Sequence, residues 1–178
     1  MEYSTLDKLG VRVSRLGFGC MRFPLTAEGK IDEPRAAAML DTAYKAGVTY
    51  YDTAYFYHQH TGEAFLGRAM KRYPRDTFYL ATKMPMSIVE SLDHAKEIFE
   101  GQLAALQTDY VDFYLLHGVN GERWKQAQEM GIVDFLLEMQ KAGRIRHFGF
   151  SFHGSYEEFE TILTARDWDF CQIQFNYM

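Results

Sequence analysis

The chain has 178 residues, with 19 Lys or Arg against 24 Asp or Glu, so its formal net charge is −5. Because 47% of its residues are hydrophobic, the chain can form a packed core, and intrinsic disorder is excluded. An acidic balance argues against nucleic-acid binding, which needs a basic face.

No apolar run reaches the ~18 residues that a membrane helix needs, and the first residues lack the layout of a signal peptide. The two cysteines, Cys20 and Cys171, are isolated, which argues against a disulfide scaffold or a structural zinc site. We therefore expect a cytoplasmic protein with no membrane partner, no nucleic-acid partner and no metal site.

Short apolar runs alternate with amphipathic segments along the whole chain. The apolar runs predict six strands, over residues 16–19, 48–51, 77–82, 111–116, 146–150 and 170–174. The amphipathic segments predict five helices, over residues 36–46, 64–70, 92–106, about 135–139 and 155–163.

Local signals mark several helix ends. Asp32 is placed to cap the first helix, and Gly47 is placed to end it. Ser155 with Glu158 three residues later is typical of a capping box at the start of the last helix. Gly67 weakens the prediction for residues 64–70, because glycine is a poor helix former.

The strands predicted at 77–82 and 111–116 are rich in aromatic and aliphatic residues and do not alternate cleanly. Strands that are buried on both faces have this composition, so we expect an α/β fold with a parallel sheet covered by helices. A closed (β/α)8 barrel needs eight strands and eight helices in ~250 residues. The pattern therefore predicts a single domain over residues 1–178, an incomplete TIM-type barrel with about six strands and five helices.

Four polar side chains stand at or just past the ends of successive predicted strands. Asp52, Lys83, His117 and Ser151 are separated by 31, 34 and 34 residues, which is about the length of one strand-plus-helix unit. In a barrel the carboxyl ends of the strands converge on one mouth, whereas an open sheet would spread these residues along an edge. The spacing favours the barrel and places the chemistry at its mouth.

Asp52, Lys83 and His117, together with Tyr57, form a set suited to proton transfer. A phenol has a pKa near ~10, and a neighbouring ammonium is expected to lower the Tyr57 pKa by stabilising phenolate. Asp52 would hold the Lys83 ammonium, and His117 would orient a carbonyl oxygen. The set contains no activated nucleophile, so a cofactor must supply the harder step.

Each residue taken alone has a purely structural explanation. Asp52 is a plausible cap, Tyr57 plausible core packing and His117 a plausible hydrogen-bonded structural histidine. His58, His60 and Glu63 are only weak evidence for a metal site, because the two histidines lie two residues apart in a loop. It is the joint occurrence at a repeated interval that favours the functional interpretation.

The motifs in their order resemble those of the aldo-keto reductases, over essentially the whole chain. The resemblance rests on Leu16-Gly17-Phe18-Gly19, Asp52-Thr53-Ala54-Tyr55-Phe56-Tyr57 with Glu63 and Gly67, Ala81-Thr82-Lys83, Asp112-Phe113-Tyr114-Leu115-Leu116-His117, Phe148-Gly149-Phe150-Ser151 and Cys171-Gln172-Ile173-Gln174-Phe175-Asn176.

The resemblance implies an NADP(H)-dependent oxidoreductase that reduces a small aldehyde or ketone by hydride transfer. Tyr57 would be the general acid, assisted by Lys83 and Asp52, and His117 would position the carbonyl. The family's nicotinamide carboxamide positions correspond to two further residues, Ser151 and Gln172.

Two features depart from the common family pattern. Phe152-His153 stands where many members have Asn after the serine, and His58 stands where Gly often follows the tyrosine. The Ser-Phe-His version, with Asn176-Tyr177-Met178, is most similar to a branch that often carries a C-terminal ferredoxin-like domain. The chain has no cysteine cluster, so we expect no iron–sulfur cluster within it.

The resemblance covers only about the first two-thirds of the family's barrel. Two strand edges, at 16–19 and 170–174, are therefore expected to be exposed and to allow self-association. Two classes of function remain open: a carbonyl reductase, or a non-catalytic barrel fragment or cofactor-sensing module that keeps the site without turnover.

Overall fold

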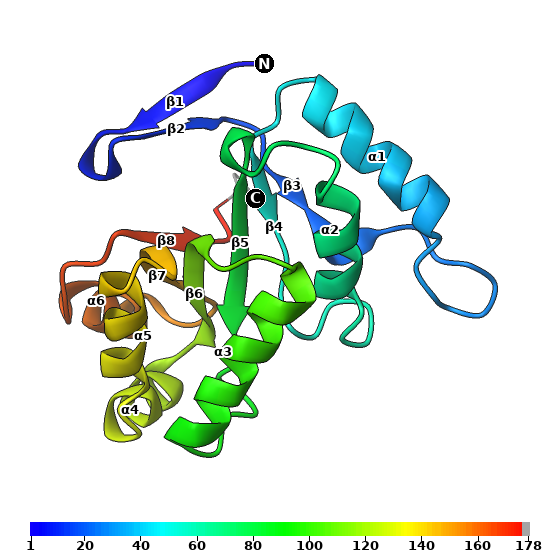
Figure 1. Cartoon of the computed structure of the whole chain (residues 1–178). Coiled ribbons are helices and arrows are strands. Elements are labelled where there is room, and N and C mark those ends of the chain that lie inside the picture. The colour runs from blue at the N-terminus through cyan, green and yellow to red at the C-terminus, as the bar shows by residue number, and fades with distance from the viewer. Residues whose placement is uncertain (176–178) are drawn as a thin grey trace.

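A computed structural model describes residues 1–175, and its main sheet has six parallel strands in chain order (Figure 1). The sheet is curled as in a (β/α)8 barrel, which confirms the predicted fold class. Its strands are β3 (Phe18–Gly19), β4 (Tyr50–Asp52), β5 (Tyr79–Met84), β6 (Val111–Val119), β7 (Ile145–Phe152) and β8 (Phe170–Ile173).

The described chain contains six α-helices, one more than the sequence predicts. They are α1 (Glu33–Lys45), α2 (Gly62–Met70), α3 (Leu92–Leu106), α4 (Gly121–Glu129), α5 (Ile132–Lys141) and α6 (Tyr156–Thr164). Within residues 1–175, none of the helices combines the length and apolar character that crossing a bilayer requires.

Helix α4 is absent from the predicted elements, and the predicted count of five helices is wrong for this reason. Only Trp124 and Ala127 are buried among its nine residues, so its apolar periodicity is too weak to recognise. The helix begins instead on a polar cap, because the Asn120 side chain accepts a hydrogen bond from the backbone N–H of Arg123 at 2.9 Å.

The predicted caps are confirmed. The Asp32 carboxylate accepts a hydrogen bond from the backbone N–H of Arg35 at 3.2 Å, and Ser155 Oγ accepts one from Glu158 N at 3.3 Å. Gly67 lies where α2 crosses the end of α3, and a Cβ added there would lie 2.5 Å from the carbonyl oxygen of Ala105. Close helix packing therefore explains a glycine that helix propensity disfavours.

A β-hairpin at the N-terminus, which the sequence analysis did not predict, closes the end of the sheet opposite the carboxyl ends of the strands. Strand β1 (Tyr3–Leu6) pairs antiparallel with β2 (Val11–Ser14). The hairpin is tied to the start of β4, because Ser14 N donates to Thr49 Oγ1 and Thr49 N donates to Ser14 Oγ, both at 2.9 Å.

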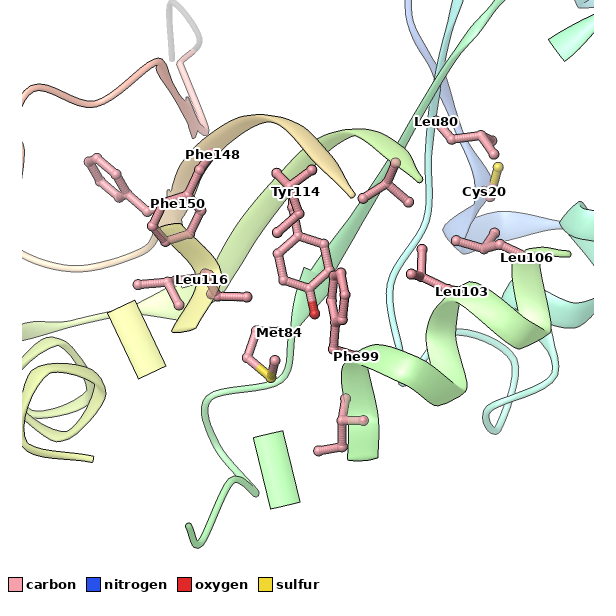
Figure 2. Close-up of a cluster of buried hydrophobic side chains, with 14 of the residues drawn as sticks. Cys20, Leu80, Met84, Phe99, Leu103, Leu106, Tyr114, Leu116, Phe148 and Phe150 are labelled. Atoms are coloured by element: carbon pink, nitrogen blue, oxygen red, sulfur yellow. The ribbon is translucent and has the colours of Figure 1, made fainter. Parts of the chain in front are cut away.

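The strands bury side chains on both faces. The outer face packs against the helices, where Tyr114 of β6 meets Phe99 of α3 edge-on with ring centroids 5.3 Å apart (Figure 2). The inner face holds a smaller cluster that the hairpin covers; its buried members are Ala81, Phe113 and Leu115, with Leu6, Leu9 and Val13 packed against them. Burial of both faces explains why β5 and β6 lack clean alternation.

Candidate active site

Five polar residues lie on the inner face of the sheet, at the carboxyl ends of five consecutive strands. Side chains alternate between faces along a strand, so residues two apart share a face. Asp52, Lys83, His117, Ser151 and Gln172 each lie two positions after a residue of that face: Tyr50, Ala81, Leu115, Phe170, and Gly149, whose added Cβ would meet the Phe170 ring. The strand register therefore directs all five side chains into one space.

Lys83 and Asp52 form a buried ion pair at this end of the sheet. Lys83 Nζ donates to Asp52 Oδ1 at 2.6 Å and to the backbone carbonyl of Thr53 at 2.8 Å. The Lys83 side chain is only 2% exposed. A buried ammonium is stable only with such partners, so Asp52 and the β4 carboxyl end hold Lys83 in place.

Tyr57 reaches the ion pair from the loop between β4 and α2. Lys83 Nζ lies 5.4 Å from the centroid of the Tyr57 ring, and the Tyr57 and His117 ring centroids are 6.4 Å apart at an interplanar angle of 83°. All six predicted site residues line one cavity of about 230 Å³, together with His153, Ile173 and Gln174. Residues predicted from separate strands thus meet around a single space.

The pKa of Tyr57 differs from the expectation. Burial, and after it the negative charge of Asp52, raises the pKa of Tyr57 to about 12. The expected lowering of the Tyr57 pKa is wrong for the chain as described, because burial of the phenol, the largest cause, and the charge of Asp52 both raise it. Tyr57 is therefore a neutral phenol over the physiological range and carries a proton that it can give away.

His117 is held neutral. Burial, and after it the positive charges of Lys83, His153 and Arg123, lowers the pKa of His117 from 6.5 to about 4. A neutral imidazole has one N–H and one lone pair, so His117 can donate a single hydrogen bond to an oxygen in the cavity.

Ser151 and Gln172 offer the hydroxyl and amide groups of the cavity. Ser151 Oγ accepts from the backbone N–H of Gly118 at 2.8 Å, and Gln172 Nε2 donates to Asp52 Oδ2 at 3.4 Å. Phe152 turns to the outer face and packs on Phe159 with centroids 5.4 Å apart. Because side chains alternate between faces, His153, two residues after Ser151, lies on the same side as Ser151 and lines the cavity.

A second cavity of about 430 Å³ shares Tyr57, His117 and His153 with the first. Its other lining residues are Met21, Phe56 and His58. The sequence analysis gave no site role to Met21, Phe56 or His153, because none of them stands at the repeated strand-end interval.

Glu63 supports the ion pair from the outer side of β5. Its Oε1 accepts from Thr82 Oγ1 at 2.5 Å and from Gln102 Nε2 at 2.8 Å, while Gln102 Nε2 also lies 3.0 Å from the carbonyl oxygen of Lys83. Burial raises the Glu63 pKa. This carboxyl belongs to the core between sheet and helices; the described residues include no group of three side chains arranged to hold a metal ion.

The fold and this cavity define the class: a TIM-type barrel with a Tyr–Lys–Asp–His set at its mouth. The sequence model of the aldo/keto reductase family matches residues 15–178. The chain therefore belongs to the aldo/keto reductase family, a family of oxidoreductases. Residues 176–178, which suggested the branch with a ferredoxin-like domain, lie outside the described residues.

Individual relatives agree with this assignment. The chain is 31% identical over 171 residues to the aldo-keto reductase YhdN of Bacillus subtilis, a match that covers 90% of this chain and 50% of YhdN. The thermostable aldo-keto reductase Tm1743, solved with the inhibitor epalrestat, superimposes with a TM-score of 0.80 at 26% identity, covering 99% of this chain and 63% of that one.

An aldo-keto reductase from Klebsiella pneumoniae, solved with NADPH, superimposes with a TM-score of 0.69 at 25% identity and covers 91% of this chain and 54% of that one. The chain thus spans about half the length of the Bacillus relative and less than two-thirds of either solved structure.

Proposed function

We propose that the chain carries the catalytic end of an NADP(H)-dependent reductase that converts small aldehydes or ketones to alcohols. The observation that carries this proposal is the meeting of Tyr57, His117 and the buried Lys83–Asp52 pair around one cavity. Family membership and the NADPH complex of the Klebsiella relative support it.

The donor set of the smaller cavity fits a nicotinamide carboxamide. A carboxamide needs one acceptor for its N–H groups and one donor for its oxygen, and the Ser151 hydroxyl and the Gln172 amide supply both kinds of group. NADPH, when bound, supplies a hydride for the carbonyl carbon. The protein's own residues then have to bind the carbonyl oxygen and deliver a proton to it.

Tyr57 is suited to deliver that proton. As the carbonyl carbon accepts the hydride, its oxygen becomes an alkoxide, which is a stronger base than phenolate. Transfer of the proton from the neutral Tyr57 phenol, with a pKa of about 12, to the alkoxide oxygen is therefore favourable in free energy, and it yields the alcohol. Solvent restores the proton to Tyr57 afterwards.

Lys83 and His117 stabilise the charges that this transfer creates. The Lys83 ammonium, 5.4 Å from the Tyr57 ring centroid, lowers the energy of the phenolate, and Asp52 keeps that ammonium in position. The neutral His117 imidazole donates its N–H to the substrate oxygen and fixes the carbonyl orientation.

The proposal is tested by two measurements on the same chain. NADPH is titrated and followed by its nicotinamide fluorescence, and NADPH oxidation is then assayed with a reactive aromatic aldehyde. We expect Tyr57→Phe to bind NADPH normally and to lose roughly 10²–10⁴-fold in turnover, the range expected for a general acid. Tyr55→Phe, in the same loop, is the matched control and should keep its activity.

Equal turnover in the wild type and Tyr57→Phe would contradict the role of Tyr57. Binding of NADPH with no turnover for any aldehyde would favour the cofactor-sensing module, and failure to bind NADPH would favour a non-catalytic fragment.

A further inference from the structure

We propose that His58 is a positioning residue that joins the loop carrying Tyr57 to the loop after β3. This inference deepens the proposed function and rests on it for its catalytic meaning. It rests structurally on an unusual backbone turn and on a bridge between the two loops, neither of which requires bound cofactor.

The turn that follows Tyr57 is left-handed. His58, Gln59 and His60 have φ values of 53°, 55° and 66°, a region that is uncommon for residues other than Gly, although Asn, Asp and His are enriched there. Three such residues in a row make an unusual turn. The turn is closed on His58 itself, because its carbonyl accepts from Thr61 N at 3.1 Å and from Thr61 Oγ1 at 2.6 Å.

This turn determines how Tyr57 is presented. The Tyr57 backbone N–H donates to the carbonyl of Ala54 at 3.1 Å, and its carbonyl accepts from Gly62 N at 3.2 Å. A Cβ at Gly62 would lie 3.0 Å from the Tyr57 carbonyl oxygen, so the chain returns very close to Tyr57 at the first residue of α2. A change in the left-handed turn therefore moves the Tyr57 backbone directly.

The His58 imidazole bridges to the loop after β3. Its Nε2 lies 3.0 Å from the carbonyl oxygen of Cys20 and 3.3 Å from the backbone nitrogen of Phe23. A protonated Nε2 donates to Cys20, and a deprotonated Nε2 accepts from Phe23, so either tautomer holds the two loops together. The ring also packs on that of buried Phe23, with centroids 5.4 Å apart.

The bridge spans one wall of the 430 Å³ cavity. Met21, which lies between the two bridged residues, and Tyr57, which precedes His58, both line that cavity. His58 therefore sets the separation between the Tyr57 loop and the opposing Met21 segment. The neighbouring His60, which has the same left-handed backbone, packs instead on the rings of Tyr55 and Phe56.

This difference supplies a matched pair of variants. Asparagine tolerates a left-handed backbone but is too short to reproduce the reach of the imidazole Nε2, so His58→Asn breaks the bridge while preserving the turn. His60→Asn makes the same chemical change in the same turn without touching residues 20–23. His58→Gln places an amide nitrogen near the position of Nε2 and is the rescue variant.

The first readout is independent of activity. The full chain is labelled with 13Cζ-tyrosine, the Tyr57 signal is assigned with Tyr57→Phe, and hydrogen exchange of the Phe23 amide is measured. In His58→Asn we expect a displaced Tyr57 signal and exchange at Phe23 at least tenfold faster. His60→Asn should leave both unchanged, and His58→Gln should restore them.

The second readout is kinetic, where the wild type turns over. His58→Asn is expected to lower kcat at least tenfold with the KM for NADPH unchanged, because Tyr57 is misplaced while the Ser151 and Gln172 groups are intact. If the wild type shows no turnover, the proposed function fails, but the Tyr57 signal still decides the positioning role.

A wild-type Tyr57 signal and wild-type Phe23 exchange in His58→Asn would overturn the inference, as would equal changes in His60→Asn. If His58→Asn does not fold, His58→Gln decides alone: a wild-type Tyr57 signal supports the bridge, and a displaced one in a folded protein contradicts it.

Discussion

His117 shows how strongly the surroundings of one side chain set its charge. The same imidazole in a solvated loop would titrate near 6.5, yet burial, and after it the nearby Lys83 ammonium, lowers the pKa of His117 to about 4. The neutral imidazole keeps one N–H, which is the group that the proposed role of His117 uses.

This shift makes the stability of the fold depend on pH. Between pH 6.5 and about pH 4 the unfolded chain takes up a proton at His117 that the folded chain does not, so the free energy of unfolding falls as the pH drops through that range. The contribution is at most about 3 kcal/mol, because the side chain is partly exposed.

We therefore expect His117→Asn to lose this part of the pH dependence. Urea unfolding at several pH values between 4 and 8 should show a steeper acid-side decline for the wild type than for the variant. Parallel curves for the two proteins would mean that His117 has an ordinary pKa in the folded chain.

His58 shows that the surroundings of a residue can also stabilise an unfavourable backbone conformation. Left-handed φ values cost of order 1 kcal/mol for an ordinary residue, which is why glycine suits the position after the tyrosine. The hydrogen bond from the imidazole and its packing on Phe23 offset that cost, so the departure from glycine is balanced by contacts to another loop.

Among the elements, α2 and α3 pack closely, with Gly67 at the crossing. Alanine normally stabilises a helix interior relative to glycine by about 0.5–1 kcal/mol. At Gly67 its methyl group would lie 2.5 Å from the Ala105 carbonyl oxygen and would have to push the helices apart. Packing therefore outweighs propensity at this position.

We expect Gly67→Ala to destabilise the fold by about 1–3 kcal/mol, the usual range for overpacking. Gly101→Ala, on the exposed side of α3 with nothing within 4 Å of its added Cβ, is the control and should be neutral or stabilising. Chemical denaturation of both variants measures the difference, and a Gly67→Ala protein as stable as the wild type would rule out the close crossing.

The elements also show which signals a sequence carries. The helices with clear apolar stripes or recognisable caps, such as α1 and α6, were predictable within a few residues, since both signals are local. Helix α4 and the β1–β2 hairpin were not, because the stability of each comes from docking: α4 buries only two side chains, and the hairpin packs on the inner face of strands far along the chain.

At the scale of the whole molecule, the described sheet has two unpaired edges. Strand β3 pairs only with β4, and β8 pairs only with β7, within residues 1–175. Near these edges Leu16 is 62% exposed and Phe175 is 90% exposed. Free strand edges beside exposed apolar side chains are templates for pairing with another chain.

We therefore propose that residues 1–178 form one incomplete barrel domain that self-associates through these edges with a second copy. Size-exclusion chromatography with light scattering should show mass that rises with protein concentration. Ile173→Lys, which puts a charge on the β8 edge, should reduce that association. A monodisperse monomer that unfolds cooperatively at all concentrations would contradict the proposal.

The candidate site was largely predictable, and the physical reason is geometric. Parallel strands end at one edge of a sheet, so polar residues such as Asp52, Lys83 and His117 at similar intervals must come near one another. The alternation of side chains also places these residues on one face, because each follows an inner-face residue by two positions. This regularity can be recognised only once the strand bounds are known.

The sequence by itself determined the order of the six sheet strands and of five of the six described helices, the parallel sheet, the main caps and six of the residues that line the cavity. The elements follow from periodicity, and Asp52, Lys83, His117 and Ser151 follow from their spacing, both of which act along the chain; the place of Gln172 in the site is what the family resemblance implies. The tertiary structure decided the raised pKa of Tyr57, the neutral His117, the outward turn of Phe152 and the bridge from His58. Desolvation and contacts between distant loops arise only when the chain has folded, so no local pattern encodes them.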